Sequence, residues 1–280
     1  MQLIFFDLDG TLLDASSQIS PFTSETLGLL KEKNIAYTVA TGRTMLSALP
    51  IMQGHGFELP QIYNNGVTVW HPKNQHMALE NVLDRSDIST VLNVVAAHGI
   101  TPFVHVIDHD QQHYIYHSDI RHDVENHLVY RYFSRINVKL LPLNELLFEN
   151  HTFAKNNQVT NISMIGENKK IYDIWLEVNA HQNLIAYSGP ALEGKQYSWM
   201  DVHHRLANKG SAVSSLKKQL GIGEVICFGD SDNDLSMFAA ADESYAPSNA
   251  IDEVKDTASA VIGHNHQDGV AHFLRERFSL

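Results

Sequence analysis

The sequence has a single cysteine, Cys227, and no long run of apolar residues. One cysteine cannot form a disulfide framework, and such scarcity is typical of a reducing compartment. A membrane-spanning helix needs about 18 or more consecutive apolar residues, and no such stretch occurs. The first apolar run is already interrupted at Asp7, so no signal peptide is expected. These absences predict a cytoplasmic protein without a membrane partner.

Positive charge is also scarce, because 20 lysines and arginines stand against 32 acids and give a formal net charge of -12. A nucleic-acid-binding surface needs a basic stripe, so a nucleic-acid partner is not expected. The charge does not exclude a phosphorylated substrate, since a bound metal ion and a few local cations set the field inside a cleft. With 280 residues, 44% of them apolar, the chain can bury a large core in one domain or two.

Two common nucleotide-binding motifs are missing. Gly221-Ile222-Gly223 precedes a predicted strand and lacks a third glycine in register, so it is no dinucleotide fingerprint. No Gly-x-x-x-x-Gly-Lys-Ser/Thr occurs, which excludes an ordinary P-loop. The 17 histidines suggest zinc, above all His105, His109, His113 and His117. No cysteine joins these four, and flanking strands would leave them mostly solvated, so a functional zinc site is the less favoured interpretation.

The first strand and the turn after it are the most informative segment. Leu3–Phe6 is an unbroken apolar run, which predicts a strand buried on both faces. Asp7 ends this run, Asp9 follows two residues later, and Gly10 permits a sharp turn. Ligands of open α/β sheets bind beyond the carboxyl ends of the strands, so both acids are predicted at a functional edge. The simpler alternative is a strand that ends in an ordinary polar turn. Such a turn commonly contains one acid, so the presence of two argues against this alternative.

Polar residues also mark the ends of other predicted elements. The predicted strand 35–40 is followed by Thr41-Gly42-Arg43, in which a hydroxyl, a flexible glycine and a guanidinium suit an anion, although a Thr-Gly turn alone is a weak signal. Asn65-Gly66 predicts a β-hairpin. Asn208-Lys209-Gly210 opens a predicted helix, from which Lys209 can reach the same edge; the alternative is an ordinary surface lysine.

A second group of acids follows the predicted strand 224–228, in the segment Gly229-Asp230-Ser231-Asp232-Asn233-Asp234. If this strand and the first belong to one parallel sheet, Asp230 and Asp234 converge with the two earlier acids. Two carboxylates about 4 Å apart repel by roughly 4 kcal/mol at an effective dielectric constant near 20, so the group needs protons, a lysine or a divalent cation. An all-oxygen set of ligands with access to water suits Mg²⁺.

The middle of the chain has a different pattern from its two ends. Strands and helices alternate at the ends, whereas antiparallel hairpin signals mix with helices from about Asn81 to Lys195. The pattern predicts an α/β fold with a Rossmann-like parallel-sheet core, residues 1–82 and 195–280, and an inserted α+β domain, residues 83–194. An insertion of about 110 residues has an ordinary domain size.

Four of these segments together resemble the motifs of the haloacid dehalogenase-like hydrolase superfamily, in particular its Cof-type phosphatases with a type IIB cap. The four segments are, in motif order, Asp7–Leu13, Thr41–Arg43, Asn208–Gly210 and Gly229–Asp234. Because the insertion lies between the second and third motifs, the resemblance covers the whole chain. It implies Mg²⁺-dependent hydrolysis of a small phosphate monoester, a sugar phosphate or similar metabolite, and a cap, residues 83–194, that sets specificity.

The resemblance also implies roles for single residues. Asp7 would be the nucleophile that forms an aspartyl-phosphate, and Asp9 would act as acid and base. Mg²⁺ would be held by Asp7, the main-chain carbonyl of Asp9, and Asp230. The phosphoryl group or the rest of the substrate would be bound by Thr41, Gly42, Arg43, Lys209 and Asn233. Asp234 and Asn249 would support the site, although Ala246-Pro247 before Asn249 departs from the commoner family pattern.

Two other functions stay open at this point. A sugar phosphomutase on the same fold would keep the aspartyl-phosphate and return it to a second hydroxyl, which a comparison of phosphate release with isomer formation distinguishes. A non-catalytic phosphate-sensing module would be favoured by loss of Asp7 or Asp9, and both are present.

Overall fold

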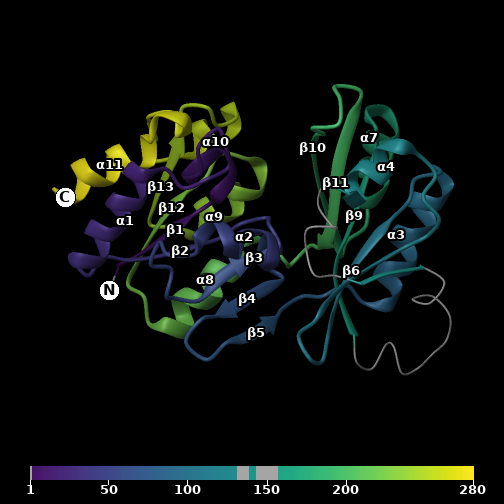
Figure 1. Cartoon of the computed structure of the whole chain (residues 1–280), viewed down its shortest axis with the longest axis horizontal. Helices are drawn as coiled ribbons and strands as arrows, with labels where there is room; N and C mark the ends of the chain where they lie inside the picture. The colour runs from purple at the N-terminus through teal and green to yellow at the C-terminus, as the bar shows by residue number, and fades with distance from the viewer. Residues whose placement is uncertain (1, 131–138, 143–156) are drawn as a thin grey trace. The chain divides into compact units, whose positions relative to one another are not determined.

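The structure, a computed structural model, describes residues 2–130, 139–142 and 157–280. The chain forms two compact units (Figure 1). The larger unit comprises Met1–Glu80 and Ala207–Leu280, and the smaller unit comprises Asn81–Leu206. Within the described ranges, no helix is both long enough and apolar enough to cross a membrane.

The larger unit is built on a five-stranded sheet with the order β14-β13-β12-β1-β2, in which all neighbours are parallel. The strands are β1 (Gln2–Phe6), β2 (Ala36–Val39), β12 (Glu224–Phe228), β13 (Glu243–Pro247) and β14 (Ala260–Ile262). Because β1 pairs directly with β12, Phe6 lies opposite Phe228, and segments from the two ends of the chain become neighbours. The predicted α/β fold with a parallel-sheet core is confirmed.

Helices flank this sheet (Figure 1). They are α1 (Pro21–Glu32), α2 (Met45–Met52), α8 (Lys209–Leu220), α9 (Leu235–Ala240), α10 (Asp252–Thr257) and α11 (Gly269–Phe278). Helix α8 has a capped start, because the Asn208 side chain accepts a hydrogen bond from the N–H of Ser211. This cap places Lys209 at the first position of the helix, beside the strand ends.

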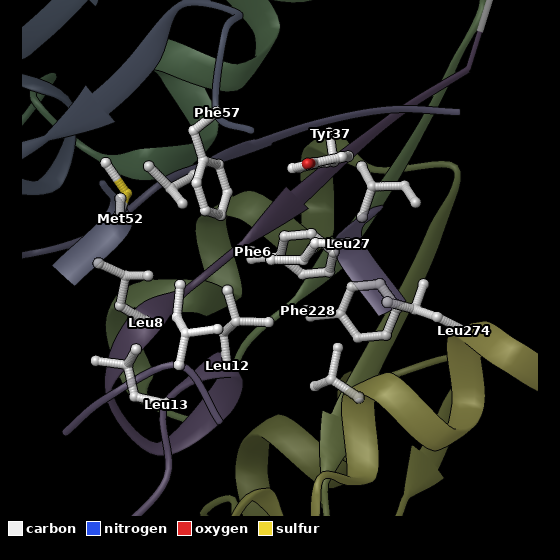
Figure 2. Packing of buried hydrophobic residues seen from close by; sticks show 14 of the residues in the cluster. Phe6, Leu8, Leu12, Leu13, Leu27, Tyr37, Met52, Phe57, Phe228 and Leu274 are labelled. Atoms are coloured by element: carbon white, nitrogen blue, oxygen red, sulfur yellow. The ribbon is translucent and has the colours of Figure 1, made fainter. Parts of the chain in front are cut away.

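The strand β1 is buried on both faces, as its unbroken apolar run predicts. Phe6 belongs to a hydrophobic cluster that includes Phe228 of β12, Leu27 of α1 and Leu274 of α11 (Figure 2). Phe5 points to the opposite face and belongs to a second cluster, which includes Val213 of α8. Burying each such side chain contributes about 1.5–3 kcal/mol, so the carboxyl end of β1 is held in a fixed position.

A small antiparallel sheet extends the larger unit. Its strands are β3 (Gln61–Tyr63), β4 (Thr68–His71) and β5 (His76–Leu79). The turn Asn64–Gly66 joins β3 to β4, so the hairpin predicted from Asn65-Gly66 is confirmed. A parallel bridge between Ala40 and Ile62 connects this sheet to the end of β2. The hairpin turn is thereby held near the strand ends of the main sheet.

The smaller unit contains a six-stranded sheet with the order β10-β11-β9-β6-β7-β8. The strands are β6 (Phe103–Asp108), β7 (His113–His117), β8 (Lys139–Pro142), β9 (Asn157–Glu167), β10 (Leu184–Pro190) and β11 (Tyr197–His204). All pairs are antiparallel except β7 with β8. Helices α3 (Arg85–Ala97) and α7 (Asn168–Asn179) contribute to one hydrophobic cluster with this sheet, and a further helix is α4 (Asp123–Leu128).

The boundary of the smaller unit differs from the predicted boundary. The sequence pattern ended the insertion at residue 194, whereas the smaller unit continues to Leu206. The reason is that β11 pairs with β10 on one side and with β9 on the other. Both partners belong to the smaller unit, so residues 195–206 belong with them instead of with the core. At its other end the unit begins at Asn81, two residues before the predicted start.

Candidate active site

Four charged side chains meet beyond the carboxyl ends of β1 and β12. Lys209 Nζ donates hydrogen bonds to Asp7 Oδ1 and to Asp234 Oδ1, each at 2.6 Å. The second oxygen of Asp234, Oδ2, accepts from the main-chain N–H groups of Asp230 at 2.9 Å and Ser231 at 3.1 Å. Carboxylate oxygens of Asp7, Asp230 and Asp234 lie within 4.8 Å of one another. The structure therefore brings together the two acid groups that the sequence places more than two hundred residues apart.

Lys209 is fully buried and stays charged because of its two partners. Burial by itself lowers the pKa of the ammonium group, but the carboxylates of Asp234 and Asp7 outweigh it and raise the pKa above its ordinary value. Among the described residues, no other ammonium or guanidinium group forms an ion pair with these carboxylates. The cluster thus has one cation for three acids.

The pKa values of two of these acids, Asp7 and Asp230, are raised. Burial raises the pKa of Asp7 well above its usual range; the neighbouring Asp234 and Asp230 carboxylates raise it further, while Lys209 opposes them. Burial likewise raises the pKa of Asp230 to about 6. A divalent cation reverses shifts of this kind, since it favours ionised carboxylates. The donor set therefore fits a divalent metal ion.

The loop after β1 passes close to Asp230 and is held there by two hydrogen bonds. Gly10 has φ +72°, and a Cβ atom there would lie 2.2 Å from Asp230 Oδ2, so a glycine is required. Thr11 Oγ1 donates to Asp230 Oδ1 at 3.1 Å. Asn249 Nδ2 donates to the main-chain oxygen of Gly10 at 2.8 Å. Asn249 thus binds the main chain of the loop, and Thr11 connects the loop to Asp230, a contact that the sequence pattern does not predict although Thr11 stands inside the first motif.

Asp9 lies outside the lysine-centred cluster and faces Arg43. Arg43 Nε donates to Asp9 Oδ2 and Arg43 Nη2 donates to Asp9 Oδ1, both at 2.6 Å. Such a two-point pair fixes the plane of the carboxylate as well as its position. The Asp9 side chain is 53% exposed, so solvent and small molecules reach it. The role of Arg43 as a phosphate-binding residue stays a prediction.

Thr41, Gly42 and Asn233 lie around the hairpin turn between β3 and β4. Thr41 Oγ1 accepts from the N–H of Arg43 at 3.1 Å. A Cβ atom on Gly42 would lie 3.2 Å from Asn65 Oδ1 and 3.5 Å from Asn233 Nδ2. Asn233 Nδ2 donates to Asn65 Oδ1 at 2.9 Å. No sequence signal predicts this contact of Asn65, because the hairpin turn alone explains the Asn-Gly pair.

The four histidines considered for zinc lie on β6, on β7 and in the turn between these strands. His105 Nδ1 and His113 Nε2 lie 3.2 Å apart. His109 lies in the turn between β6 and β7, between two acids, Asp108 and Asp110. Ligand atoms of these three turn residues lie within 4.8 Å of one another, as many acidic groups on protein surfaces do. Their main-chain and side-chain contacts are those of a tight turn, since Asp108 Oδ1 accepts from the N–H of Asp110 at 2.9 Å.

Comparisons with known proteins extend over the whole chain. A family model described as haloacid dehalogenase-like hydrolase matches residues 4–274. The chain is 31% identical over 292 residues to the 5-amino-6-(5-phospho-D-ribitylamino)uracil phosphatase YitU of Bacillus subtilis, which covers 99% of this chain and 98% of that protein. A solved haloacid dehalogenase-like hydrolase from B. subtilis matches with a TM-score of 0.79 at 23% identity, covering 98% of this chain and 99% of that one.

A solved subclass IIB sugar phosphatase, BT4131, matches with a TM-score of 0.74 at 18% identity and covers 100% of this chain and 99% of that one. The matches to solved structures agree with the fold, and the family match includes all four motif segments. The chain belongs to the haloacid dehalogenase-like hydrolases and is a phosphatase of that family.

Proposed function

We propose that the protein is a Mg²⁺-dependent phosphatase that hydrolyses small phosphate monoesters through an aspartyl-phosphate on Asp7. The observation that carries this proposal is the buried Lys209, which bridges Asp7 and Asp234 at 2.6 Å each. Lys209 occupies Asp7 Oδ1, while Asp7 Oδ2 accepts no hydrogen bond from the described residues. That second oxygen is the one we assign as the attacking atom.

Mg²⁺ is proposed to bind Asp7, the main-chain carbonyl of Asp9, and Asp230. All of these donors are oxygens, which Mg²⁺ prefers. A bound Mg²⁺ brings the carboxylate and the phosphate together despite their like charges and neutralises charge on the phosphoryl oxygens. Asp234 is assigned a supporting role, since Lys209 occupies one of its oxygens and two main-chain N–H groups occupy the other.

In the first proposed step, a carboxylate oxygen of Asp7 attacks phosphorus and the bond from phosphorus to the ester oxygen breaks. Asp9 gives its proton to that leaving oxygen. Phosphoryl transfer depends mainly on positioning and on neutralising charge, so Lys209, Thr41 and Asn233 are proposed to bind the phosphoryl oxygens. The pair with Arg43 orients the ionised Asp9 carboxylate, so Asp9 must leave this pair and take up a proton before it acts as the acid.

In the second step, a water molecule attacks the phosphorus of the aspartyl-phosphate and gives a proton to Asp9. The bond between Asp7 and phosphorus breaks, which releases inorganic phosphate and restores the carboxylate. The covalent intermediate divides one difficult displacement into two easier ones. Asp9 thereby acts first as an acid and then as a base.

The proposed substrates are small phosphorylated metabolites, such as sugar phosphates. The names of two similar proteins support this class, one a (phosphoribitylamino)uracil phosphatase and the other a sugar phosphatase. The smaller unit is proposed to act as the cap that selects among these esters. The sugar phosphomutase alternative predicts isomer formation without net release of phosphate.

Phosphate release from a panel of phosphorylated metabolites, with and without Mg²⁺, tests the proposed function. We expect release that depends on Mg²⁺ and that excess chelator abolishes. Asp230→Asn should lose metal activation while it remains folded. Asp232→Asn is the matched control, because an amide oxygen can still accept from the N–H of Asn233 as Asp232 Oδ1 does. Undiminished release in excess chelator, or isomer formation in place of release, would contradict the proposal.

A further inference from the structure

The hairpin turn between β3 and β4 has an unusual backbone. Asn64, Asn65 and Gly66 all have positive φ, at 49°, 53° and 102°. An Asn-Gly pair alone makes a tight hairpin turn, and residues with side chains adopt left-handed conformations mostly one at a time. Two such residues before the glycine store strain, which persists where surrounding contacts impose it and is frequent at functional sites.

Three main-chain hydrogen bonds connect this hairpin to the segment that follows β2. The N–H of Asn65 donates to the main-chain oxygen of Thr41 at 3.1 Å, and the N–H of Asn64 donates to that of Arg43 at 2.9 Å. The N–H of Thr41 donates in turn to the main-chain oxygen of Ile62, on β3, at 3.0 Å. The hairpin therefore fixes the backbone of the segment that carries Thr41.

The same turn packs against the start of α8. A Cβ atom on Gly66 would lie 2.5 Å from the main-chain oxygen of Asn208 and 3.2 Å from the Cβ atom of Ala212. Asn208 caps the helix, and Lys209 is its first residue. The positive φ and this close approach together require a glycine at residue 66. The turn thus contacts both the segment after β2 and the helix that carries Lys209.

The side chain of Asn65 adds a contact with the segment after β12. Asn233 Nδ2 donates to Asn65 Oδ1 at 2.9 Å, and Asn65 is only 4% exposed. An amide oxygen can only accept, so Asn233 must turn its NH₂ group toward Asn65. The reverse orientation of the Asn233 amide would bring two acceptors together. Asn65 thereby determines which end of this amide lies beside Gly42, whose Cβ position is 3.5 Å from Asn233 Nδ2.

This orientation leaves Asn233 with one unsatisfied atom and one unused donor. Its Oδ1 is buried and has no hydrogen-bond partner in the part of the chain that the structure describes. A buried acceptor without a partner is unfavourable, so the contact with Asn65 holds the amide in this orientation. An NH₂ group has two N–H donors, and Asn65 uses one of them. The second can bind an oxygen atom that only accepts, as phosphoryl oxygens do.

A purely structural role in the turn is the alternative for Asn65. Asparagine suits left-handed turns, because its side chain can bond to main-chain groups two residues away. The Asn65 side chain instead accepts from a residue that is 168 positions away in the sequence. A glycine adopts the same backbone conformation without strain. The turn therefore does not need the amide, whereas the orientation of Asn233 does.

We infer that Asn65 is a positioning residue of the phosphate site. Its main chain holds Thr41, and its side chain orients the Asn233 amide so that one N–H is presented to a phosphoryl oxygen. The inference rests on the proposed phosphatase function, in which Thr41 and Asn233 bind phosphoryl oxygens. Donors that are oriented before the ligand arrives bind it more tightly, because less ordering is needed on binding.

Binding of inorganic phosphate in the presence of Mg²⁺, measured by titration calorimetry, tests the inference without turnover. Asn65→Gly keeps the left-handed turn and removes the amide. We expect it to weaken phosphate binding about tenfold, since one oriented hydrogen-bond donor is lost. Asn34→Gly is the matched control, because Asn34 also has a positive φ, 56°, but lies exposed after α1. It should leave phosphate binding unchanged.

A double-mutant cycle with Asn233→Ala distinguishes positioning from a general disturbance of the site. If Asn65 acts through Asn233, Asn65→Gly should weaken phosphate binding no further once Asn233→Ala is present. A merely structural role predicts that the two effects multiply. Unchanged phosphate binding in Asn65→Gly, or multiplied effects in the double variant, would overturn the inference.

Gly42→Ala carries the test if Asn65→Gly does not fold. Its Cβ atom would lie 3.2 Å from Asn65 Oδ1 and 3.5 Å from Asn233 Nδ2, so it presses on both ends of this hydrogen bond. It should weaken phosphate binding in the wild-type protein and not in Asn233→Ala, and equal weakening in both would overturn the inference. If the wild-type protein fails to hydrolyse p-nitrophenyl phosphate, the proposed function is overturned, while phosphate binding still decides the role of Asn65.

Discussion

At the scale of single residues, the charge balance of the site depends on Lys209. Its ammonium group contacts two buried carboxylates and has no exposed surface. Removing one partner from a buried ion pair leaves an uncompensated charge, which typically costs about 3–5 kcal/mol. Lys209 therefore contributes to folding as well as to the proposed binding of phosphate.

Lys209→Met should lower the free energy of unfolding by about 3–5 kcal/mol, because Asp7 and Asp234 are left without their cation. Urea denaturation at pH 7 measures this change. Lys217→Met on the same helix is the matched control, since Lys217 pairs with the largely exposed Asp242 at 2.8 Å. Exposed pairs contribute little, so a loss in Lys217→Met as large as that in Lys209→Met would contradict the account.

Residues at element ends could be predicted from the sequence, whereas the contacts of a turn residue such as Asn65 could not. Asp7 and Asp230 each follow an apolar strand, and Lys209 begins a capped helix, so their placement at one edge follows from a parallel sheet. Asn65 contacts Asn233 from a hairpin turn. Because the turn alone explains the Asn-Gly pair, the sequence gives no separate sign that Asn65 belongs to the site. The pairing of Asp9 with Arg43 depends on two side-chain conformations, which no sequence pattern specifies.

At the scale of elements, the loop after β1 must fit closely around Asp230. Gly10 combines a positive φ with a close approach to that carboxylate, whereas Gly221 at the end of α8 has φ +64° and open space around its Cβ position. The two glycines therefore differ in packing and share a similar backbone conformation. Their comparison isolates the effect of the contact.

Gly10→Ala should lose metal activation, because its Cβ atom would displace the Asp230 carboxylate. Gly221→Ala should show only the backbone strain of about 1 kcal/mol that both variants share. Titration of phosphate release with Mg²⁺ gives the apparent affinity for the metal ion, and urea denaturation gives the stability. Equal metal activation in the two variants would show that the Asp230 side chain does not need this space.

The elements of the core were more predictable than the limits of the insertion. Strand β1 is apolar from Leu3 to Phe6, as the part of a strand that is buried on both faces must be. Strand β11 carries polar residues such as Asp201 and His203, and its partners β9 and β10 lie earlier in the chain. Local sequence does not reveal which sheet such a strand joins, so the end of the smaller unit at Leu206 does not follow from the local pattern.

At the scale of the whole molecule, buried neutral histidines make stability depend on pH. The pKa of His203 in the folded protein is about 4, below the ordinary value of 6.5. As the pH falls from 6.5 toward 4, the unfolded chain binds a proton that the folded protein does not, so stability is lost as pH falls and regained as it rises. The opposite sign applies to Asp201, whose pKa is raised to about 6.

Between pH 7 and pH 5, the contribution of His203 to the free energy of unfolding should fall by about 2 kcal/mol. His203→Leu removes this contribution. Between pH 7 and pH 5, the free energy of unfolding of the variant should therefore fall by about 2 kcal/mol less than that of the wild-type protein. Urea denaturation, monitored by tryptophan fluorescence, measures this difference for both proteins at the two pH values. The same pH dependence in both proteins would mean that His203 is not buried in its neutral form.

The central claim is that Asp7 is the nucleophile and Asp9 the acid and base. A nitrophenolate leaves readily without a proton, whereas water attack in the second step still needs a base, and such assistance is worth about 10²–10⁴ in rate. Asp9→Asn should therefore form the aspartyl-phosphate from p-nitrophenyl phosphate and then stall. Asp7→Asn has no attacking carboxylate and should do neither.

Rapid mixing of each variant with p-nitrophenyl phosphate and Mg²⁺ tests this claim most directly. For Asp9→Asn we predict a burst of nitrophenolate equal to the amount of enzyme, followed by little turnover. For Asp7→Asn we predict no burst and no turnover. A burst of the same size in Asp7→Asn would contradict the account, because it would place the nucleophile on another residue.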